Sequence, residues 1–316
     1  MSIGRALAAG LLYVATGEQY IEEARRSARS AAAVMPDVAI GLVTDAPLAD
    51  PAFSDVIVLE QSTADPRGYK LAACRASPFE RTVLLDSDTH VAADLATLFE
   101  LLDRFDFAAW PDCYIPYMRS HASPELPASF PEFNTGVIAF ARRPRTDALL
   151  QRWSEIYAQH AERGVGHDQP SLRQALWNCP DVRLGSLLAE YNFFPYWPAL
   201  LVGPVRVVHA RPCEPLAALA TRLNRTTEPR IYLPDGRILQ LEDRTDTAAM
   251  LGHLLADLRN AIDAAAHGGL PTALPRLRNR VLRRLGRRKV YGPPANPGIE
   301  EWLVEKLSDQ RPEPPP

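Results

Sequence analysis

Short apolar runs alternate with amphipathic segments in the first third of the chain. Aliphatic and β-branched residues at 11–16, 38–44 and 55–59 predict strands, and the Ala- and Arg-rich segment 18–34 predicts a helix. Strands that alternate with helices at this spacing are typical of an α/β sheet with parallel strand pairs. In such sheets ligands bind beyond the carboxyl ends of the strands, so we look for functional residues there.

The same alternation continues to residue 266. Further strands are predicted at 82–88, 107–110, 133–140 and 205–210, and helices at 69–76, 94–105, 146–162 and 168–177. Residues 111–132 are rich in Pro, Ser and aromatic residues and predict a loop that covers a site. A hairpin at 231–241, turning at Pro234-Asp235-Gly236, precedes a mostly apolar helix at 247–266. We therefore expect one domain over residues 1–266 and a tail over 267–316.

The tail combines an apolar stripe with a dense run of basic residues. Leu274, Leu277, Val281 and Leu285 recur at helical spacing, and residues 276–289 hold eight basic side chains and no acidic one. Two interpretations stay open: a basic helix at 271–289 that lies on an anionic membrane surface, and a solvated helix that packs its stripe on the rest of the protein. The basic run lacks interleaved aromatic residues, so we do not expect nucleic-acid binding. Residues 310–316 are Pro-rich and predict disorder.

Composition places the chain among soluble globular proteins. It is 47% hydrophobic and 23% charged, and its formal charge is −3, which leaves −11 outside the basic run. The four cysteines, Cys74, Cys113, Cys179 and Cys213, are scattered, which argues against a zinc site and a disulfide framework. The apolar N-terminus lacks a convincing cleavage site, and no stretch reaches the ~20 apolar residues of a membrane span. We expect a cytoplasmic protein, held at the inner face of the membrane if the tail binds there.

Two carboxylates close the strand predicted at 82–88. If the strand continues to its end, Asp86 and Asp88 point to the same side of the sheet. Two like charges repel unless a cation lies between them, and carboxylate oxygens suit Mg²⁺ or Mn²⁺, which commonly bridge protein carboxylates to substrate phosphates. A plain strand end followed by a turn is the alternative, because Asp and Ser are common turn residues.

Several further polar positions lie before and after these carboxylates, in an order that a known family shares. They are Lys70, Asn134-Thr135-Gly136, Asp168-Gln169 and His209. Together with Asp86-Ser87-Asp88 they make the chain resemble the GT-A glycosyltransferases, closest to the retaining family-eight type. The resemblance spans residues 11–211. It implies an α/β fold with a Rossmann-like, mixed and mostly parallel sheet flanked by helices, followed here by a helical C-terminal extension.

The resemblance implies a role for each matched position. Asp86 and Asp88 match the family's D-x-D motif, and His209 matches the third protein ligand of a Mn²⁺ (or Mg²⁺) ion that holds the donor diphosphate. Asp168 and Gln169 match the pair beneath the reacting anomeric carbon and are the catalytic candidates. The remaining donor-binding candidates are Ala15, Thr16 and Tyr20 for the nucleotide base, Lys70, Ser87, Asn134, Thr135 and Gly136 near the sugar, and Arg211 for the diphosphate.

The chain departs from the family pattern at two places. Gly17 stands where an acidic or amide residue usually reads uracil, which weakens the case for a UDP-linked donor in particular. The family's His is followed by Gly and then Lys, whereas here His209 is followed by Ala210 and Arg211. Arg211 is therefore the cation we assign to the diphosphate.

The function implied is the metal-dependent transfer of a sugar from a nucleotide-diphosphate sugar to a glycan, lipid-linked or protein acceptor, with retention. Asp168 could form a covalent intermediate or support same-face attack, and both routes stay open. A sugar-nucleotide nucleotidyltransferase is a competing hypothesis. Nucleotidyltransferases carry a Gly-rich basic phosphate loop after the first strand, and this chain lacks such a loop there. A nucleotide-sugar-binding protein without turnover is another. Taken singly, Lys70, Asn134, Asp168 and His209 also have structural explanations as a solvated lysine, a turn, a helix cap and a strand end.

Overall fold

The computed structural model describes residues 7–59, 65–112, 126–211 and 214–240, which fall into two compact units. The first unit contains the described residues up to Phe194 together with Val205–Thr221, and the second contains Pro195–Pro204 and the residues from Arg222 onward. The predicted helix at 247–266, the domain boundary at 266 and the whole tail lie outside the described residues, as does most of the predicted loop at 111–132.

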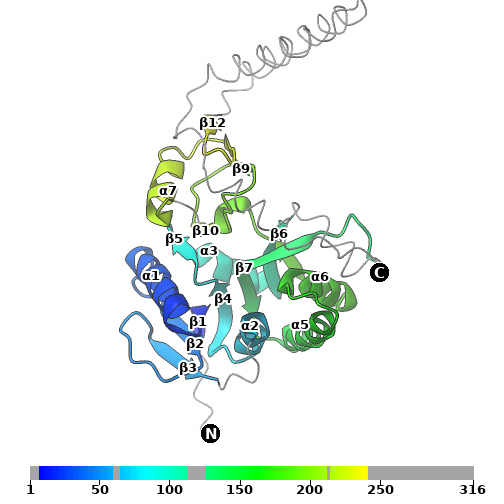
Figure 1. The fold of residues 1–316 in the computed structure, drawn as a ribbon. Helices are drawn as coiled ribbons and strands as arrows, with labels where there is room; N and C mark the ends of the chain where they lie inside the picture. Colours follow the sequence, from blue (N-terminus) through cyan, green and yellow to red (C-terminus); the bar gives the residue numbers. More distant parts are fainter. Residues whose placement is uncertain (1–6, 60–64, 113–125, 212–213, 241–316) are drawn as a thin grey trace, which may run out of the picture. The chain divides into compact units, whose positions relative to one another are not determined.

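The first unit is built on a seven-stranded mixed sheet with the order β3-β2-β1-β4-β7-β6-β8 (Figure 1). The strands are β1 (Leu7–Val14), β2 (Ala39–Thr44), β3 (Asp55–Val58), β4 (Phe79–Leu85), β6 (Phe107–Asp112), β7 (Glu132–Ala141) and β8 (Leu184–Ser186). Neighbours pair in parallel except that β7 runs antiparallel to both β4 and β6. The predicted α/β fold with a mixed, mostly parallel sheet is confirmed.

Helices cover both faces of this sheet. They are α1 (Glu18–Val34), α2 (Pro66–Arg75), α3 (Ala96–Arg104), α5 (Pro144–Glu162) and α6 (Asp168–Asn178). Leu85 and Val137 pack in one core with residues of α1 and α3, whereas their chain neighbours Leu84 and Ile138 pack in a second core with residues of α2, α5 and α6. Every residue of β7 is buried. Burial on both faces explains why these strands are continuous apolar runs rather than alternating ones.

The strand predicted at 82–88 ends early, at Leu85, and this part of the prediction is wrong. The Asp86 N–H still bonds the Gly136 carbonyl, but residues 86–88 form a turn, and the Thr89 hydroxyl donates to the Asp86 carbonyl at 2.7 Å. After the turn a short strand, β5 (Thr89–Val91), pairs antiparallel with β10 (Val207–His209). The turn, rather than strand alternation, sets the directions of Asp86 and Asp88.

The second unit contains a small antiparallel sheet. Its strands are β9 (Ala199–Leu201), β11 (Arg230–Tyr232) and β12 (Ile238–Gln240), in the order β12-β11-β9. β11 and β12 form the predicted hairpin, and Gly236 in its turn has a φ of 84°, a conformation that glycine adopts easily. The remaining described elements are a 3₁₀ turn at Ala189–Tyr191, which belongs to the first unit, and helix α7 (Leu216–Leu223), most of which does. None of the described helices has the length and apolar character needed to cross a membrane.

Candidate functional site

A cavity of about 420 Å³ opens at the carboxyl edge of the parallel strands β1 and β4. Because β7 is antiparallel to β4, its first residues reach this same edge, as does the N-terminus of α6. All the site residues predicted from the sequence line the cavity: Ala15, Thr16, Tyr20, Lys70, Asp86, Ser87, Asp88, Asn134, Thr135, Gly136, Asp168, Gln169, His209 and Arg211. The size lies within the range of small-molecule sites.

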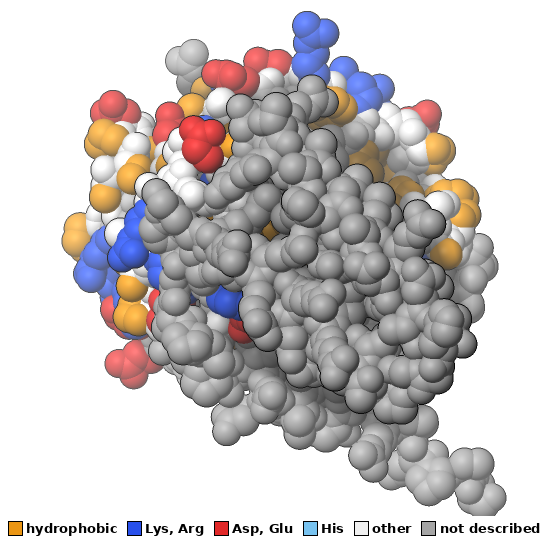
Figure 2. Space-filling view, turned by 90° about the horizontal axis from the view of Figure 1, so that it is seen from above, with side chains coloured by type: hydrophobic (Ala, Val, Ile, Leu, Met, Phe, Trp, Pro, Cys, Tyr) orange, Lys and Arg blue, Asp and Glu red, His pale blue; other side chains and the backbone are white. Residues whose placement is uncertain are grey.

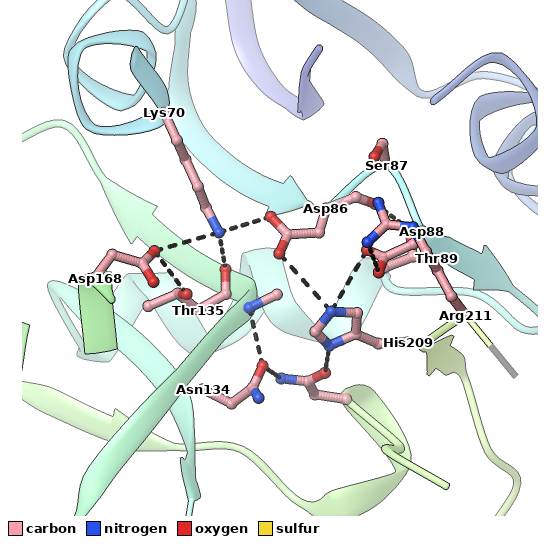
Figure 3. A network of polar contacts seen from close by, with 12 residues as sticks. Lys70, Asp86, Ser87, Asp88, Thr89, Asn134, Thr135, Asp168, His209 and Arg211 are labelled. Atoms are coloured by element: carbon pink, nitrogen blue, oxygen red, sulfur yellow. Dashed lines mark hydrogen bonds and ion pairs between the residues drawn. The ribbon is translucent and has the colours of Figure 1, made fainter. Parts of the chain in front are cut away.

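Asp86, Asp88 and His209 converge on one point of the cavity. Each offers a ligand atom, and these atoms lie within 4.8 Å of one another. His209 Nε2 lies 3.7 Å from Asp86 Oδ2 and 3.6 Å from Asp88 Oδ1 (Figure 3). Pairing of β10 with β5 brings the histidine next to the turn that carries both carboxylates. Two carboxylates and an imidazole suit a divalent ion such as Mn²⁺, so the residues present fit the metal that the motif implied.

Gly136 provides the space for the His209 ring. A Cβ atom at residue 136 would lie 1.9 Å from His209 Cε1, far inside van der Waals contact. Any side chain at this position would therefore push the imidazole away from Asp86 and Asp88. The glycine of the Asn-Thr-Gly segment thus has a clear structural purpose, in addition to the donor contact expected from the sequence.

Lys70 lies between two carboxylates rather than in solvent (Figure 3). Its Nζ is 2.6 Å from Asp86 Oδ1 and 3.6 Å from Asp168 Oδ2, and it donates to the Thr135 carbonyl at 2.8 Å. Burial alone would lower the pKa of Lys70, but the charges of Asp86 and Asp168 outweigh burial and raise it above its ordinary value. Lys70 is therefore a fixed ammonium that links the metal-site carboxylate Asp86 to the catalytic candidate Asp168.

Asp168 is buried at the first turn of α6 and its carboxylate points into this network. Thr135 Oγ1 donates to Asp168 Oδ2 at 2.8 Å, and the buried indole of Trp153 donates to the Asp168 carbonyl at 3.0 Å. His167 holds the N-cap position, so Asp168 is not a capping residue. The adjacent Gln169 donates from Nε2 to Asp112 Oδ2 at 3.2 Å.

Arg211 is held by a glutamate that the sequence motifs did not indicate. Glu23 receives hydrogen bonds from Arg211 Nε at 3.1 Å and Nη2 at 2.8 Å, while Nη1 lies 3.3 Å from Asp88 Oδ2. The guanidinium also lies 5.5 Å from the centre of the Tyr20 ring, and Ser87 Oγ donates to Glu23 Oε2 at 3.0 Å. Burial opposes ionisation of Glu23, but the hydrogen bonds and charge of Arg211 lower its pKa below the ordinary value. Glu23 follows Tyr20 by one helical turn on α1, which was the available signal.

Two more polar residues beside the cavity network were also missed. Asp112 is buried at the end of β6 and accepts from Asn134 Nδ2 at 3.4 Å as well as from Gln169. Asn192 is fully buried, and its Oδ1 lies 3.0 Å from His209 Nδ1. Asp112 comes two residues after the strand predicted at 107–110, so its position was a usable signal. Asn192 follows no such element.

The departure at Gly17 has a backbone explanation. Gly17 is the N-cap residue of α1 and has a φ of 77° and a ψ of 153°, a conformation that residues with side chains rarely adopt. The chain therefore passes from Thr16 to Tyr20, both of which line the cavity, through a turn that favours glycine. An acidic or amide residue at this position would strain the turn.

Comparison with known proteins identifies the fold. No protein-family model and no curated protein sequence matches the chain. Among solved structures, a galactosyltransferase LgtC in complex with donor and acceptor sugar analogs is 15% identical, with 69% of this chain and 98% of that chain covered and a TM-score of 0.50. The glycosyltransferase GlyE of Streptococcus pneumoniae TIGR4, in its apo form, is 16% identical, with 71% and 57% covered and a TM-score of 0.48. The likeness to the LgtC structure shows that this chain has the GT-A fold.

Proposed function

We propose that this protein is a metal-dependent glycosyltransferase that moves a sugar from a nucleotide-diphosphate sugar to an acceptor. One observation carries the proposal: in a cavity of a GT-A fold, the cluster Asp86, Asp88 and His209 is joined through Lys70 to the carboxylate of Asp168. A cation site for a diphosphate and a carboxylate for a reacting sugar thus stand side by side. This is the arrangement that cleavage of a sugar–diphosphate bond requires.

Charge at the metal cluster supports binding of the donor diphosphate. When bound, a divalent ion such as Mn²⁺ or Mg²⁺ neutralises the negative charge that grows on the departing diphosphate. Asp86, Asp88 and His209 would hold it, and Arg211, which is fixed beside Asp88 by Glu23, adds a second positive charge. Tyr20, Ala15 and Thr16 line the same cavity, where we place the nucleotide base of a UDP-linked donor.

Asp168 and Gln169 are the residues that we assign to the sugar carbon. Loss of the diphosphate leaves positive charge on that carbon, which a carboxylate or amide oxygen stabilises. Thr135 and Lys70 fix the Asp168 carboxylate in one orientation. We propose transfer with retention, either through a covalent intermediate on Asp168 or by attack on the same face.

We also propose that the acceptor is a sugar and that the protein acts in the cytoplasm. A sugar acceptor is supported by the sugar analogs in the LgtC complex, which has the same fold, and a lipid-linked or protein-bound glycan would present such a sugar. The free thiols of Cys74 and Cys179 suit the reducing cytoplasm.

A panel of nucleotide sugars tests the proposal. The full-length protein is incubated with UDP-, GDP-, ADP- and dTDP-linked hexoses and Mn²⁺, and free nucleoside diphosphate is measured. We expect slow hydrolysis of at least one UDP-sugar that stops with EDTA and returns with Mn²⁺. Formation of a nucleoside triphosphate from pyrophosphate and a nucleotide sugar would favour a nucleotidyltransferase. Donor binding without any turnover would favour a binding protein.

Replacement of Asp168 tests the assignment of the catalytic group. In Asp168→Ala we expect turnover to fall at least ~100-fold, the effect of losing an electrostatic stabiliser, with nucleoside diphosphate affinity retained. Calorimetry with UDP and Mn²⁺ measures the affinity. Turnover at the wild-type rate would refute the role. Ser154→Ala, on the neighbouring helix α5, serves as the control, since its hydroxyl bonds only a helix carbonyl among the described contacts.

A further inference from the structure

The two ring nitrogens of His209 face different surroundings. Nε2 points at the carboxylates of Asp86 and Asp88, while Nδ1 lies 3.0 Å from Asn192 Oδ1 on the opposite side. A neutral imidazole carries its proton on one nitrogen only, and a metal binds the other. The partner of Nδ1 therefore decides whether Nε2 is available to a cation.

A backbone amide fixes the direction of the hydrogen bonds that lead to this histidine. The Gly136 N–H can only donate, and it lies 2.9 Å from Asn134 Oδ1, so that atom must be the amide oxygen. The atom of Asn192 that lies 2.8 Å from the same oxygen must then be its amino nitrogen. Consequently the amide oxygen of Asn192 faces His209, and Nδ1 must be the donor.

The other end of Asn134 agrees with this direction. Its Nδ2 lies 3.4 Å from Asp112 Oδ2, where an amino group meets a carboxylate oxygen. Reversing Asn134 would place two acceptors together here and two donors together at Gly136. Asn134 and Asn192 are both buried, so bulk water does not replace these partners.

We propose that Asn192 is a positioning residue that holds His209 in the tautomer with its proton on Nδ1, so that the Nε2 lone pair faces Asp86 and Asp88. Asn134 orients Asn192 in turn and so acts on the metal site as well as lining the cavity. The identity of the bound cation rests on the proposed function, whereas the tautomer does not. Outer partners of this kind typically change metal affinity 10- to 100-fold.

The tautomer can be measured directly in the wild-type protein. Side-chain ¹⁵N shifts of metal-free, ¹⁵N-histidine-labelled protein at mildly alkaline pH report which ring nitrogen carries the proton, and a His209→Gln sample assigns the signals. We expect a protonated Nδ1 and a bare Nε2. A neutral ring that carries its proton on Nε2 and leaves Nδ1 bare would overturn the proposal. This measurement does not depend on any Asn192 variant folding correctly.

The effect on the metal is measured with Asn192→Ala. We expect its Mn²⁺ affinity, followed by the free-ion EPR signal, to fall 10- to 100-fold. Thr82→Ala is the matched control because Thr82 is also fully buried and loses a hydrogen bond, to Ser77 at 2.7 Å, away from the cavity. Its Mn²⁺ affinity should stay at the wild-type value even if its stability falls.

The two variants separate positioning from general destabilisation. An unchanged Mn²⁺ affinity in Asn192→Ala, or an equal loss in Thr82→Ala, would overturn the role of Asn192. Failure of the proposed function looks different: the wild-type protein would bind Mn²⁺ with the expected tautomer yet process no nucleotide sugar.

Discussion

At the residue scale, each carboxylate that lines the cavity faces a basic side chain. Lys70 lies between Asp86 and Asp168, and Arg211 lies beside Asp88. If the substrate is the nucleotide-diphosphate sugar that we propose, this pairing keeps the acidic cluster from repelling it, because the fixed cations offset much of the cluster's charge. The proposed site would therefore attract a divalent ion and a diphosphate in the same place.

Asp88 should be indispensable for metal-dependent binding. One of its oxygens faces His209 and the other faces Arg211, so Asp88→Asn removes charge from both contacts. We expect Mn²⁺-dependent binding of UDP to be lost in calorimetric titrations. Asp181→Asn, an exposed carboxylate outside the cavity lining, should titrate like wild type. An unchanged titration of Asp88→Asn would remove Asp88 from the site.

Replacement of Glu23 gives a test in which the sign of the effect is informative. If Glu23 only adds negative charge near a site for an anion, Glu23→Gln should strengthen binding of UDP with Mn²⁺. We expect the opposite, a loss of about tenfold, because Arg211 loses the partner that holds it at the site. Glu22→Gln on the same helix, where Glu22 pairs with Arg25, is the control. Tighter binding in Glu23→Gln would contradict the positioning of Arg211.

The candidate residues that local order marks in the sequence all line one cavity, and their roles stay predictions. The strand ends and the short Asn-Thr-Gly and Asp-Gln segments are contiguous in the chain, so they could be recognised in a single sequence. Glu23 and Asn192 escaped because their partners are distant: Glu23 meets Arg211 from 188 residues away. The one-turn spacing of Glu23 from Tyr20 indicated a shared helix face but not Arg211 as the partner, and no such spacing marked Asn192.

At the element scale, the antiparallel strand β7 makes the site possible. It inserts between β4 and β6 and presents its first residues, rather than its last, at the cavity edge. Among the described residues the predicted strands and helices occur in the predicted order, because most are long apolar or amphipathic runs, but helix α7 was not predicted. The short strands β5, β8 and β9 were missed because three residues carry no readable period.

Gly136 on β7 should tolerate no side chain. In Gly136→Ala the new Cβ collides with the His209 ring, which lies on β10, so the ring must leave its place. We expect Mn²⁺ affinity to fall at least ~10-fold, as on loss of a ligand's support. Gly203→Ala, where a Cβ meets nothing within 4 Å, is the control. Equal Mn²⁺ affinity of all three proteins would show that His209 does not bind the ion.

Asp106 joins three elements of the first unit through arginines. Its fully buried carboxylate lies 2.9 Å from Arg183 Nη2, 2.7 Å from Arg143 Nη1 and 3.3 Å from Arg145 Nε. The hydrogen bond from Arg183 has the largest effect on the pKa of Asp106 and, with Arg143, holds it well below the usual range despite burial. A carboxyl with a lowered folded-state pKa stabilises the fold above its ordinary pKa, and this stability is lost as pH falls through the folded value.

Asp106→Asn should therefore destabilise the fold in a pH-dependent manner. Urea unfolding at neutral pH should show a loss of about 3 kcal/mol, the cost of breaking a buried ion pair. The difference from wild type should shrink as the pH falls below about 4, because the wild-type carboxylate then begins to lose its advantage. Asp103→Asn removes only an exposed pair with Arg81 and should change stability little. A pH-independent difference would contradict the electrostatic explanation.

At the scale of the whole molecule, charge is unevenly distributed along the chain. Residues 276–289 carry eight basic side chains, while the protein as a whole has a formal charge of −3. The described part of the face in Figure 2 carries acidic and basic side chains interspersed with apolar ones. Residues 276–289 are therefore a strongly basic segment of the sequence, although they lie outside the described residues.

Removal of residues 271–316 tests whether that run seeks membranes. We expect the full-length protein to sediment with vesicles that contain anionic lipid, and the truncated protein to remain in solution. The attraction of Lys and Arg to anionic lipid is electrostatic, so added salt should weaken it. Vesicles of neutral phosphatidylcholine are the control. Equal sedimentation of both proteins would leave the solvated-helix interpretation standing.

The pairing of β10 with β5 determines when the candidate metal cluster can form during protein synthesis. A nascent chain exposes Asp86 and Asp88 long before His209 is synthesised, and all three residues belong to one compact unit, which folds as a whole. The three candidate ligands can therefore meet only after β10 has emerged and paired with β5. A divalent ion would therefore bind only after most of the fold has formed. If the proposed function is correct, the chain should still fold in a cell that is starved of divalent metal but remain inactive.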